Sequence, residues 1–202
     1  MTPLDYALLA QEAYATQSPT IGFVTDASCA IVREYPDERV VAFRGTSNLK
    51  ALLADFRVAE GAHPVLGDIH AGFWYTWVRM RGAVLGLPAD KPIVFTGHSL
   101  GAALAIIAAA EFAAEKREVA AVYGFAPPRV SPQDKVKSVL IDTPMWLYRN
   151  GKDVVTEVPL AWPQPSLLLP IGKPSFPVLN LRDHAIARYI TALQDNGQTS
   201  TT

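Results

Sequence analysis

The sequence predicts an α/β fold, in which a mainly parallel central sheet is covered by helices on both faces and has antiparallel strands at its N-terminal edge. Strand-like and helix-like segments alternate through the middle of the chain, which is typical of parallel strands joined by helices. The length of 202 residues suits one domain with a substantial core. We therefore expect a single domain over residues 1–202, with a frayed polar tail from about residue 195.

The first half of the chain predicts a helix, a hairpin and a second helix. Thr2 to Asp5 has the pattern of a helix start, with an N-cap threonine, a proline at the first position and an acid at the third, and the helix should run to about Tyr14. Ala30–Tyr35 and Arg39–Phe43 predict two strands joined by a Pro-Asp-Glu turn. Apolar residues at positions 49, 52, 53 and 56 predict a short amphipathic helix.

The second half alternates between helices and strands. The expected elements are a helix over Phe73–Leu85, a strand over Ile93–Thr96, a long Ala-rich helix after it, a strand over Val119–Phe125, a helix from a Ser131 cap to about Leu140, a strand over Met145–Arg149, and a last helix capped by Asp183 and ending near Gln194. Pro159–Pro177 holds many prolines and predicts a long loop or an irregular hairpin.

Composition excludes several classes of function. No apolar run reaches membrane-spanning length, although 50% of the residues are hydrophobic. The net charge is −1 and the sequence shows no basic cluster, so we expect no nucleic-acid partner. The four histidines lack metal-ligand spacing, so we expect neither a metal nor another cofactor. A lone Cys29 excludes an internal disulfide, and the first residues lack a signal-peptide pattern, which predicts a cytoplasmic protein or export by a non-standard route.

The most informative segment is Gly97-His98-Ser99-Leu100-Gly101, a G-x-S-x-G motif between a β-branched strand and the Ala-rich helix. Strand, sharp turn and helix form the context of a nucleophile elbow, in which Ser99 would hold strained backbone geometry with its hydroxyl available. A side chain at either glycine would clash where the strand end packs against the helix start. The motif therefore predicts a nucleophilic serine.

A serine nucleophile needs a base and an orienting carboxylate. In the elbow-containing hydrolases the chain order is serine, acid, histidine, and His184 is the single histidine after Ser99. Asp153 follows the strand Met145–Arg149 at the carboxyl edge of the sheet, where ligands bind, and is the favoured acid, with Glu157 in reserve. Asp142 lies at the wrong end of that strand.

The other acids have simpler roles. Glu111, Glu115 and Glu118 lie on or just past the helix that leads away from the elbow, and Asp134 occupies a capping position. Asp183 adjoins the histidine in sequence and is interpreted as a helix cap, because it would be strained in reaching the neighbouring ring.

An oxyanion hole needs two donors. The backbone N–H of Leu100, directly after the nucleophile, is the first. A second should come from the loop after an early strand, where Gly45 permits close backbone approach and Thr46 offers both an N–H and a hydroxyl. The alternative for this loop is an ordinary strand turn with a hydroxyl cap on the next helix.

These residues resemble the class 3 (fungal-type) lipases of the α/β-hydrolase superfamily. The matching motifs are Phe43-Arg44-Gly45-Thr46, Asp55, His70-Ala71-Gly72-Phe73, Gly97-His98-Ser99-Leu100-Gly101, Phe125-Ala126-Pro127-Pro128-Arg129-Val130 and Arg149-Asn150-x-x-Asp153-Val154-Val155. The resemblance implies the α/β-hydrolase fold and assigns nucleophile, acid, base and oxyanion donor to Ser99, Asp153, His184 and Thr46. The segment around His184 is only loosely similar, and the disulfides of the longer secreted fungal members have no counterpart.

In that family a short amphipathic helix after the oxyanion residue acts as a lid, and residues 49–56 have the corresponding place. Leu49, Leu52 and Leu53 would cover an acyl pocket or else pack in the core. Trp162, among prolines near the acid, is a candidate pocket wall.

The sequence thus predicts a lipase or esterase that acts on acyl esters through a Ser-His-Asp triad and an acyl-enzyme. Its partner would be a small-molecule or lipid ester, in solution or at a lipid–water interface. A phospholipase, a feruloyl-type esterase, an acyltransferase and a thioesterase share the same machinery. A non-catalytic binding module is disfavoured, because every chemical position is filled.

Overall fold

The computed structural model describes residues 1–25, 28–46, 48, 57–176 and 181–199. The helices are α1 (Pro3–Ala15), α3 (Ala71–Leu85), α4 (Leu100–Ala114), α5 (Lys135–Val139), the 3-10 turn η1 (Val154–Glu157) and α6 (Ile186–Thr199). The strands are β1 (Ile21–Gly22), β2 (Cys29–Glu34), β3 (Arg39–Phe43), β4 (Val58–His63), β5 (Gly67–His70), β6 (Ile93–His98), β7 (Val119–Phe125), β8 (Met145–Asn150) and β9 (Leu168–Ile171).

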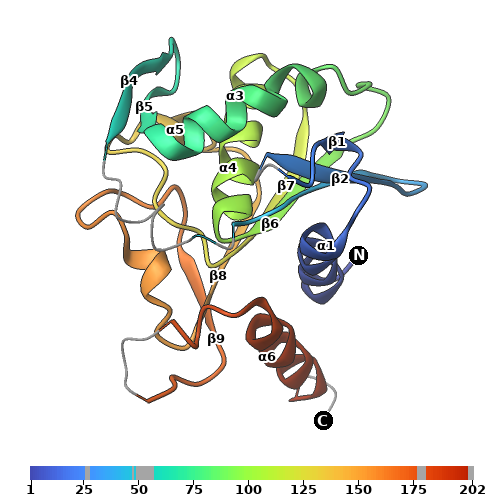
Figure 1. The fold of residues 1–202 in the computed structure, drawn as a ribbon, viewed down its shortest axis with the longest axis vertical. Coiled ribbons are helices and arrows are strands. Elements are labelled where there is room, and N and C mark those ends of the chain that lie inside the picture. The colour runs from blue at the N-terminus through green and yellow to red at the C-terminus, as the bar shows by residue number, and fades with distance from the viewer. Residues whose placement is uncertain (26–27, 47, 49–56, 177–180, 200–202) are drawn as a thin grey trace.

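Seven strands form the central sheet in the order β1-β2-β3-β6-β7-β8-β9 (Figure 1). The pairs β1–β2 and β2–β3 are antiparallel, whereas every later pair, from β3–β6 to β8–β9, is parallel. The predicted fold class, with its antiparallel N-terminal edge, is confirmed. Strands β3, β6, β7 and β8 all run in one direction, so the loops that follow them meet at one edge of the sheet.

Helices α1 and α6 cover one face of the sheet, and α3, α4 and α5 cover the other (Figure 1). The α4 side is packed with aromatic side chains, among them Phe43, Phe95 and Trp77. Helix α4 is buried on all sides from Leu100 to Phe112, because it lies between the sheet and α3. The opposite core holds Phe125 of β7 and Tyr189 of α6.

The start of α1 follows from its first residues, as predicted. The Asp5 N–H donates to Thr2 Oγ1 at 3.3 Å, and the Thr2 N–H donates to Asp5 Oδ2 at 2.7 Å, which is a capping box with Pro3 at the first helical position. The hairpin β2–β3, helices α3 and α4, and strands β6, β7 and β8 also match their predicted positions to within a few residues.

The predicted loop or hairpin over Pro159–Pro177 is wrong in part, because β9 lies within it. Strand β9 pairs with β8 in parallel, with Leu147 opposite Leu168 and Asn150 opposite Ile171. Pro170 disguises this strand in the sequence, since proline lacks a ladder donor. It is tolerated here because β9 is the edge strand of the sheet.

Three other predictions need correction. Helix α6 continues through residues 195–199, so this part of the expected frayed tail is helical. Helix α5 begins at Lys135 rather than after Ser131, whose hydroxyl instead donates to the Asp68 carbonyl at 2.7 Å. Asp183 does not cap α6, as described below. The tail was predicted to be frayed because its residues from 195 onward are polar, but polar side chains do not end a helix that has a face in contact with solvent.

The two-stranded sheet β4–β5 was not predicted, because its sequence mixes charges, histidines and glycine. The predicted amphipathic helix over residues 49–56 lies outside the described residues. Within the part of the chain that the structure describes, no helix is long and apolar enough to cross a bilayer.

Candidate active site

A strained turn joins β6 to α4, and Ser99 lies at its apex. Its backbone has φ 59° and ψ −124°, a region that residues with a Cβ rarely adopt. A Cβ on Gly97 would lie 2.3 Å from the Gly101 carbonyl carbon, and one on Gly101 would lie 2.2 Å from the Phe43 carbonyl oxygen. Both glycines are therefore required by close backbone packing, which is the geometry that the G-x-S-x-G motif predicts.

Ser99 is held by its backbone, whereas its side chain is uncommitted. The Ser99 N–H donates to the Phe125 carbonyl at 2.9 Å, and its carbonyl accepts from the N–H groups of Ala102 and Ala103. Its buried Oγ makes no hydrogen bond to any described residue, His184 included. Bonds between a nucleophile and its base are often long without substrate and tighten in the complex, so Oγ is available for chemistry.

His184 and Asp153 form a buried pair. The His184 Nδ1–H donates to Asp153 Oδ2 at 2.8 Å, and both residues are at most 9% exposed. An ionised carboxylate only accepts hydrogen bonds, so this contact fixes the imidazole in the tautomer whose Nε2 is free to take a proton. The favoured acid and the histidine thus meet although 31 residues separate them.

Asp153 is oriented by further donors. The Val155 N–H donates to Oδ1 at 3.0 Å, and the Tyr189 hydroxyl of α6 donates to Oδ2 at 2.7 Å. Burial and the Asp153 carboxylate raise the pKa of Tyr189 well above its ordinary value, so the phenol keeps its proton and remains a donor. The carboxylate therefore receives hydrogen bonds on both oxygens.

The reserve acid is engaged elsewhere. Glu157 accepts from Arg129 at 2.8 Å and from Arg149 in a second ion pair, so its carboxylate holds the loops after β7 and β8 together. Glu111 of α4 is fully buried and forms an ion pair with Arg81 of α3. Asp142 precedes β8 at the opposite edge of the sheet, as expected.

Asp183 anchors the loop that carries His184, the predicted base. Its buried carboxylate accepts from the backbone N–H groups of Lys152 and Ser175 at 3.0 and 3.1 Å. Burial alone would raise the pKa of Asp183, but these hydrogen bonds and the charge of Arg188 lower it below its ordinary value. Since Lys152 directly precedes Asp153, Asp183 ties the loop of His184 to the turn that bears Asp153. Its carboxylate is engaged there, and α6 begins only at Ile186, so the helix-cap prediction is wrong.

A second anchor reaches His184 from the elbow itself. His98 Nε2 lies 2.7 Å from the His184 carbonyl oxygen, and its Nδ1 lies 2.9 Å from the Tyr14 hydroxyl. A carbonyl only accepts, so Nε2 carries the proton and Nδ1 accepts from Tyr14. Burial, together with the nearby His184, lowers the pKa of His98 well below its ordinary value, which keeps this imidazole neutral.

The predicted oxyanion residues lie at the two strand ends that meet here. Strand β3 pairs with β6 so that Phe43 is opposite Gly97, which brings the loop after β3 beside the elbow. A Cβ on Gly45 would lie 2.8 Å from the His98 carbonyl oxygen, which shows how closely this loop approaches. Thr46 Oγ1 accepts from the Asn48 N–H at 3.0 Å, leaving its proton free to donate. Leu100 opens α4, so its N–H has no acceptor within the helix.

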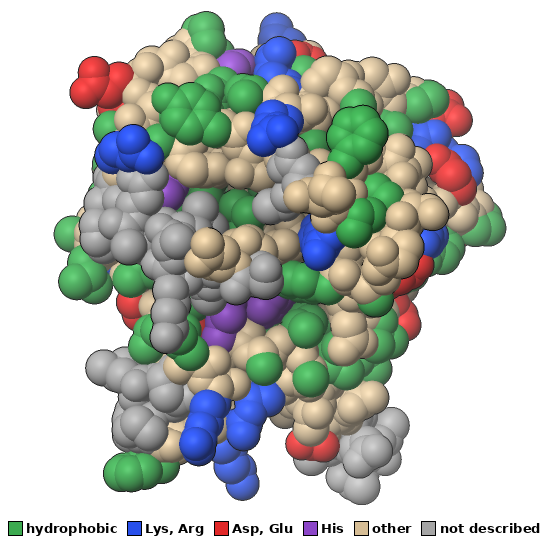
Figure 2. Space-filling view, in the orientation of Figure 1, with side chains coloured by type: hydrophobic (Ala, Val, Ile, Leu, Met, Phe, Trp, Pro, Cys, Tyr) green, Lys and Arg blue, Asp and Glu red, His purple; other side chains and the backbone are tan. Residues whose placement is uncertain are grey.

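The remaining predicted site residues are only partly described. Leu49, Leu52 and Leu53, the candidate lid residues, lie outside the described residues. Trp162 is half-buried, with its ring 6.1 Å from the His70 ring, and His70 stacks on Phe73. In Figure 2, histidine side chains lie in a hollow of the surface.

Sequence reasoning missed the residues that position the triad: Tyr14, His98, Asn150, Asp183 and Tyr189. The Asn150 side chain donates to the Asp183 carbonyl at 2.9 Å, beside the other anchors of the base loop. Each partner is far away in the sequence, so local patterns carry little information about them. The histidine inside the elbow motif was the one available signal, since a buried titratable group beside a nucleophile needs partners.

The chain is similar to lipases from fungi. Two secreted mono- and diacylglycerol lipases A, from Penicillium cyclopium and Penicillium camembertii, are each 29% identical to it over 148 residues. The match covers 68% of this chain and 48% of each relative, so the chain spans about half the length of the curated relatives it matches.

Solved structures share the fold. The mono- and diacylglycerol lipase of Aspergillus oryzae superposes with a TM-score of 0.64 at 22% identity, over 92% of this chain and 86% of that one. The Rhizomucor miehei triacylglyceride lipase gives 0.64 at 21% identity, over 78% and 74%. The family model for class 3 lipases matches residues 40–162, which include the predicted elbow around Ser99, the predicted acid Asp153 and the predicted oxyanion loop at Thr46. The chain therefore belongs to the class 3 lipase family.

Proposed function

We propose that this chain is a serine carboxylester hydrolase that cleaves acyl esters through an acyl-enzyme. The observation that carries the proposal is the buried 2.8 Å hydrogen bond from His184 to Asp153, next to an elbow serine whose Oγ is bound to no described group. The strained backbone at Ser99 and the buried polar side chains reduce the stability of the fold, so they indicate a functional role. A nucleophile elbow beside a histidine and a carboxylate is the arrangement used for acyl transfer. Membership in the class 3 lipase family supports the same reaction.

In the first half-reaction, Ser99 Oγ attacks the ester carbonyl carbon while His184 Nε2 takes the hydroxyl proton. Asp153 stabilises the resulting imidazolium through the hydrogen bond to Nδ1. The carbonyl oxygen becomes an oxyanion, which accepts from the Leu100 N–H and from Thr46. The ester C–O bond then breaks, and the alcohol leaves with the proton from His184.

Water completes the cycle. His184 takes one proton from a water molecule, and the hydroxide attacks the acyl carbon bound to Ser99. The second tetrahedral intermediate collapses, Ser99 Oγ regains a proton from His184, and the carboxylic acid is released. The anchors on the base loop matter in both steps, because His184 must reach the serine and then the water from one fixed position.

Acylglycerols are the first substrates to test, because both curated relatives are named mono- and diacylglycerol lipases. A panel of nitrophenyl esters of increasing chain length, run below and above the micelle concentration, separates a lipase from a soluble esterase. Activity that rises on aggregated long-chain esters supports a lipid substrate, and activity confined to short soluble esters supports an esterase.

The proposed nucleophile is tested with a fluorophosphonate, which reacts with activated serines. We expect one labelled peptide, containing Ser99, and no labelling of Ser99→Ala. The exposed Ser138 on α5 supplies a matched control, since Ser138→Ala should label like the parent protein. Labelling that survives in Ser99→Ala would refute the proposal.

An acyltransferase or thioesterase would use the same triad with another acceptor or leaving group. Product analysis in water with and without added alcohol distinguishes them. A hydrolase gives free acid as the main product in both reactions, whereas an acyltransferase gives the new ester.

A further inference from the structure

Four cations that are scattered in the sequence come together beside the base loop. They are Lys152, Lys173, Arg182 and Arg188, all exposed, and we call them the basic patch. Asp183 lies at the centre of the patch and directly follows Arg182 in the sequence. Its carboxylate accepts a hydrogen bond from the Lys152 N–H and lies 3.5 Å from the Arg188 guanidinium. Lys173 and Arg188 line one hollow. The sequence showed no basic cluster because these four residues are separated along the chain, whereas the fold brings them to one edge.

Few acids balance these cations. Asp183 is fully buried, with its carboxylate bound by backbone N–H groups and Arg188. Asp195 lines the same hollow as Lys173 and Arg188. Asp153, which directly follows Lys152, is buried and bonded to His184. Four cations against these three acids leave a net charge of +1 in a chain whose total is −1. Figure 2 shows a group of Lys and Arg side chains together below the hollow that holds histidines.

Apolar side chains flank the patch. Phe176 is 85% exposed and follows Ser175, whose N–H is bound by Asp183. Leu181 is 42% exposed and lies three residues before His184. Exposed aromatic and aliphatic groups among cations are typical of surfaces that insert into an anionic lipid layer, where the headgroups attract the charge and the acyl region takes the side chains.

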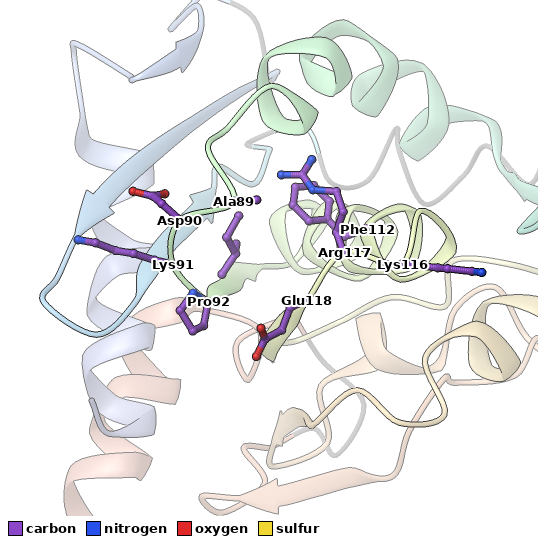
Figure 3. Close-up of a pocket in the computed structure, with 9 residues that line it drawn as sticks. Ala89, Asp90, Lys91, Pro92, Phe112, Lys116, Arg117 and Glu118 are labelled. Carbon is purple, nitrogen blue, oxygen red and sulfur yellow. The ribbon is translucent and has the colours of Figure 1, made fainter.

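The opposite edge of the sheet lacks this bias. A cavity of about 330 Å³ there is lined by Lys91, Lys116 and Arg117 together with Asp90 and Glu118 (Figure 3). Lys91 lies 3.5 Å from Glu34, and Arg117 donates to the carbonyls of Leu85 and Leu87. Both signs of charge face one hollow, so the field there is weak.

We infer that the basic patch docks the protein on anionic lipid surfaces and thereby presents the triad edge to esters in that surface. The inference rests on the proposed function, because docking matters only if the triad acts on esters in the lipid layer. The patch lies beside that triad, since Lys152 adjoins Asp153 and Arg182 lies two residues from His184. A lipid surface is favoured over nucleic acid because Phe176 and Leu181 border the cations and would remain in water on a nucleic-acid backbone.

The test measures binding rather than turnover. Ser99→Ala protein, which cannot consume the lipid, is sedimented with mixed phosphatidylglycerol–phosphatidylcholine vesicles and with pure phosphatidylcholine vesicles. We expect binding to the mixed vesicles only. Binding should be lost between about 0.1 and 1 M salt, because the Debye screening length falls from about 10 to about 3 Å over this range. The double change Lys152→Gln/Lys173→Gln should weaken binding about thirtyfold, or about fivefold for each lysine.

Lys135→Gln/Lys137→Gln is the matched control, because both lysines are exposed on α5 and the change in net charge is identical. This variant should bind like the parent, and melting curves should show that both double variants are folded. The inference would be overturned if the patch variant bound the mixed vesicles as well as the parent does, or if the control variant were weakened as much as the patch variant. Binding of the parent to duplex DNA but not to mixed vesicles would overturn it as well. Fluorophosphonate labelling of the parent reports on the triad separately, so failure of docking and failure of the proposed function are distinguishable.

Discussion

The two edges of the central sheet both contain ionisable residues, but these residues differ in burial and in their bonding partners. At the amino edge, Asp90 and Glu118 face Lys91, Lys116 and Arg117 across an open cavity (Figure 3). At the carboxyl edge, Asp153 and His184 are buried and bonded to each other, to Tyr189 and to backbone N–H groups. The first set lines a hollow and includes Lys91, which pairs with Glu34, whereas the second is buried and bonded within itself.

This difference shows that a hollow is a weaker indicator of chemistry than a constrained polar network. Among the described residues, the amino-edge cavity contains no serine, cysteine or histidine that could act as a nucleophile or base. The carboxyl edge has a strained serine at a helix start and an oriented imidazole. Parallel strands explain the asymmetry, since the loops that follow them converge at one edge.

The two carboxylates after β8 provide the sharpest internal contrast. Asp153→Asn should lower kcat about 10⁴-fold on a soluble ester, because an amide favours the wrong tautomer of His184. Glu157→Gln should change kcat little, since Glu157 binds Arg129 and Arg149 rather than the base. Steady-state kinetics of both variants decide the acid, and a large loss at Glu157 with a small one at Asp153 would reverse the assignment.

The next effect concerns the oxyanion. Thr46→Val keeps the shape and the backbone N–H but removes the hydroxyl, and the loss of one oxyanion donor typically lowers kcat about 10²–10³-fold with little change in KM. Thr143→Val, before β8 at the amino edge, is the matched control and should leave kcat unchanged. An unaltered kcat in Thr46→Val would mean that the side-chain donor lies elsewhere.

A smaller effect is expected from the support of the acid. Tyr189→Phe removes the hydroxyl that donates to Asp153 Oδ2 at 2.7 Å. Asp153 would then orient His184 less firmly. We expect kcat to fall about tenfold, which raises the activation free energy by about 1.4 kcal/mol, while KM stays near the parent value. A rise in KM with constant kcat would place Tyr189 in substrate binding instead.

The smallest effect is on stability. The pKa of His98 is lowered in the folded protein, so the unfolded state binds a proton first as the pH falls below about 6.5. The free energy of unfolding should therefore decline between pH 7 and pH 5, and the decline should be shallower in His98→Asn. Urea denaturation at the two pH values measures both slopes, and identical slopes would contradict a neutral, buried His98.

Much of the carboxyl edge was predictable because its signals are local. The glycines around Ser99, the β-branched run before it and the Ala-rich helix after it are contiguous in the sequence, and the structure places them as predicted. Asp153 was favoured because it follows strand β8. Since β8 runs parallel to its neighbour β7, its end lies at the carboxyl edge, where Asp153 meets His184.

The rest depends on contacts between distant segments. Asp183 was interpreted as a helix cap because its neighbours in sequence favour that role, but its partners Lys152 and Ser175 lie on other loops. Tyr14 reaches His98 across 84 residues. Strand β9 was hidden by Pro170, which only an edge position tolerates. Such partners become visible only when the tertiary fold is known.

The central claim is that the carboxyl edge carries the chemistry through Ser99. It is tested most directly by the turnover of Ser99→Ala on a soluble short-chain ester, with a melting curve to show that the protein is folded. Loss of a triad nucleophile lowers kcat by about 10⁶-fold in a well-characterised protease, and a decrease of that order is expected here. A folded Ser99→Ala protein that kept a substantial part of the parent turnover would contradict the account.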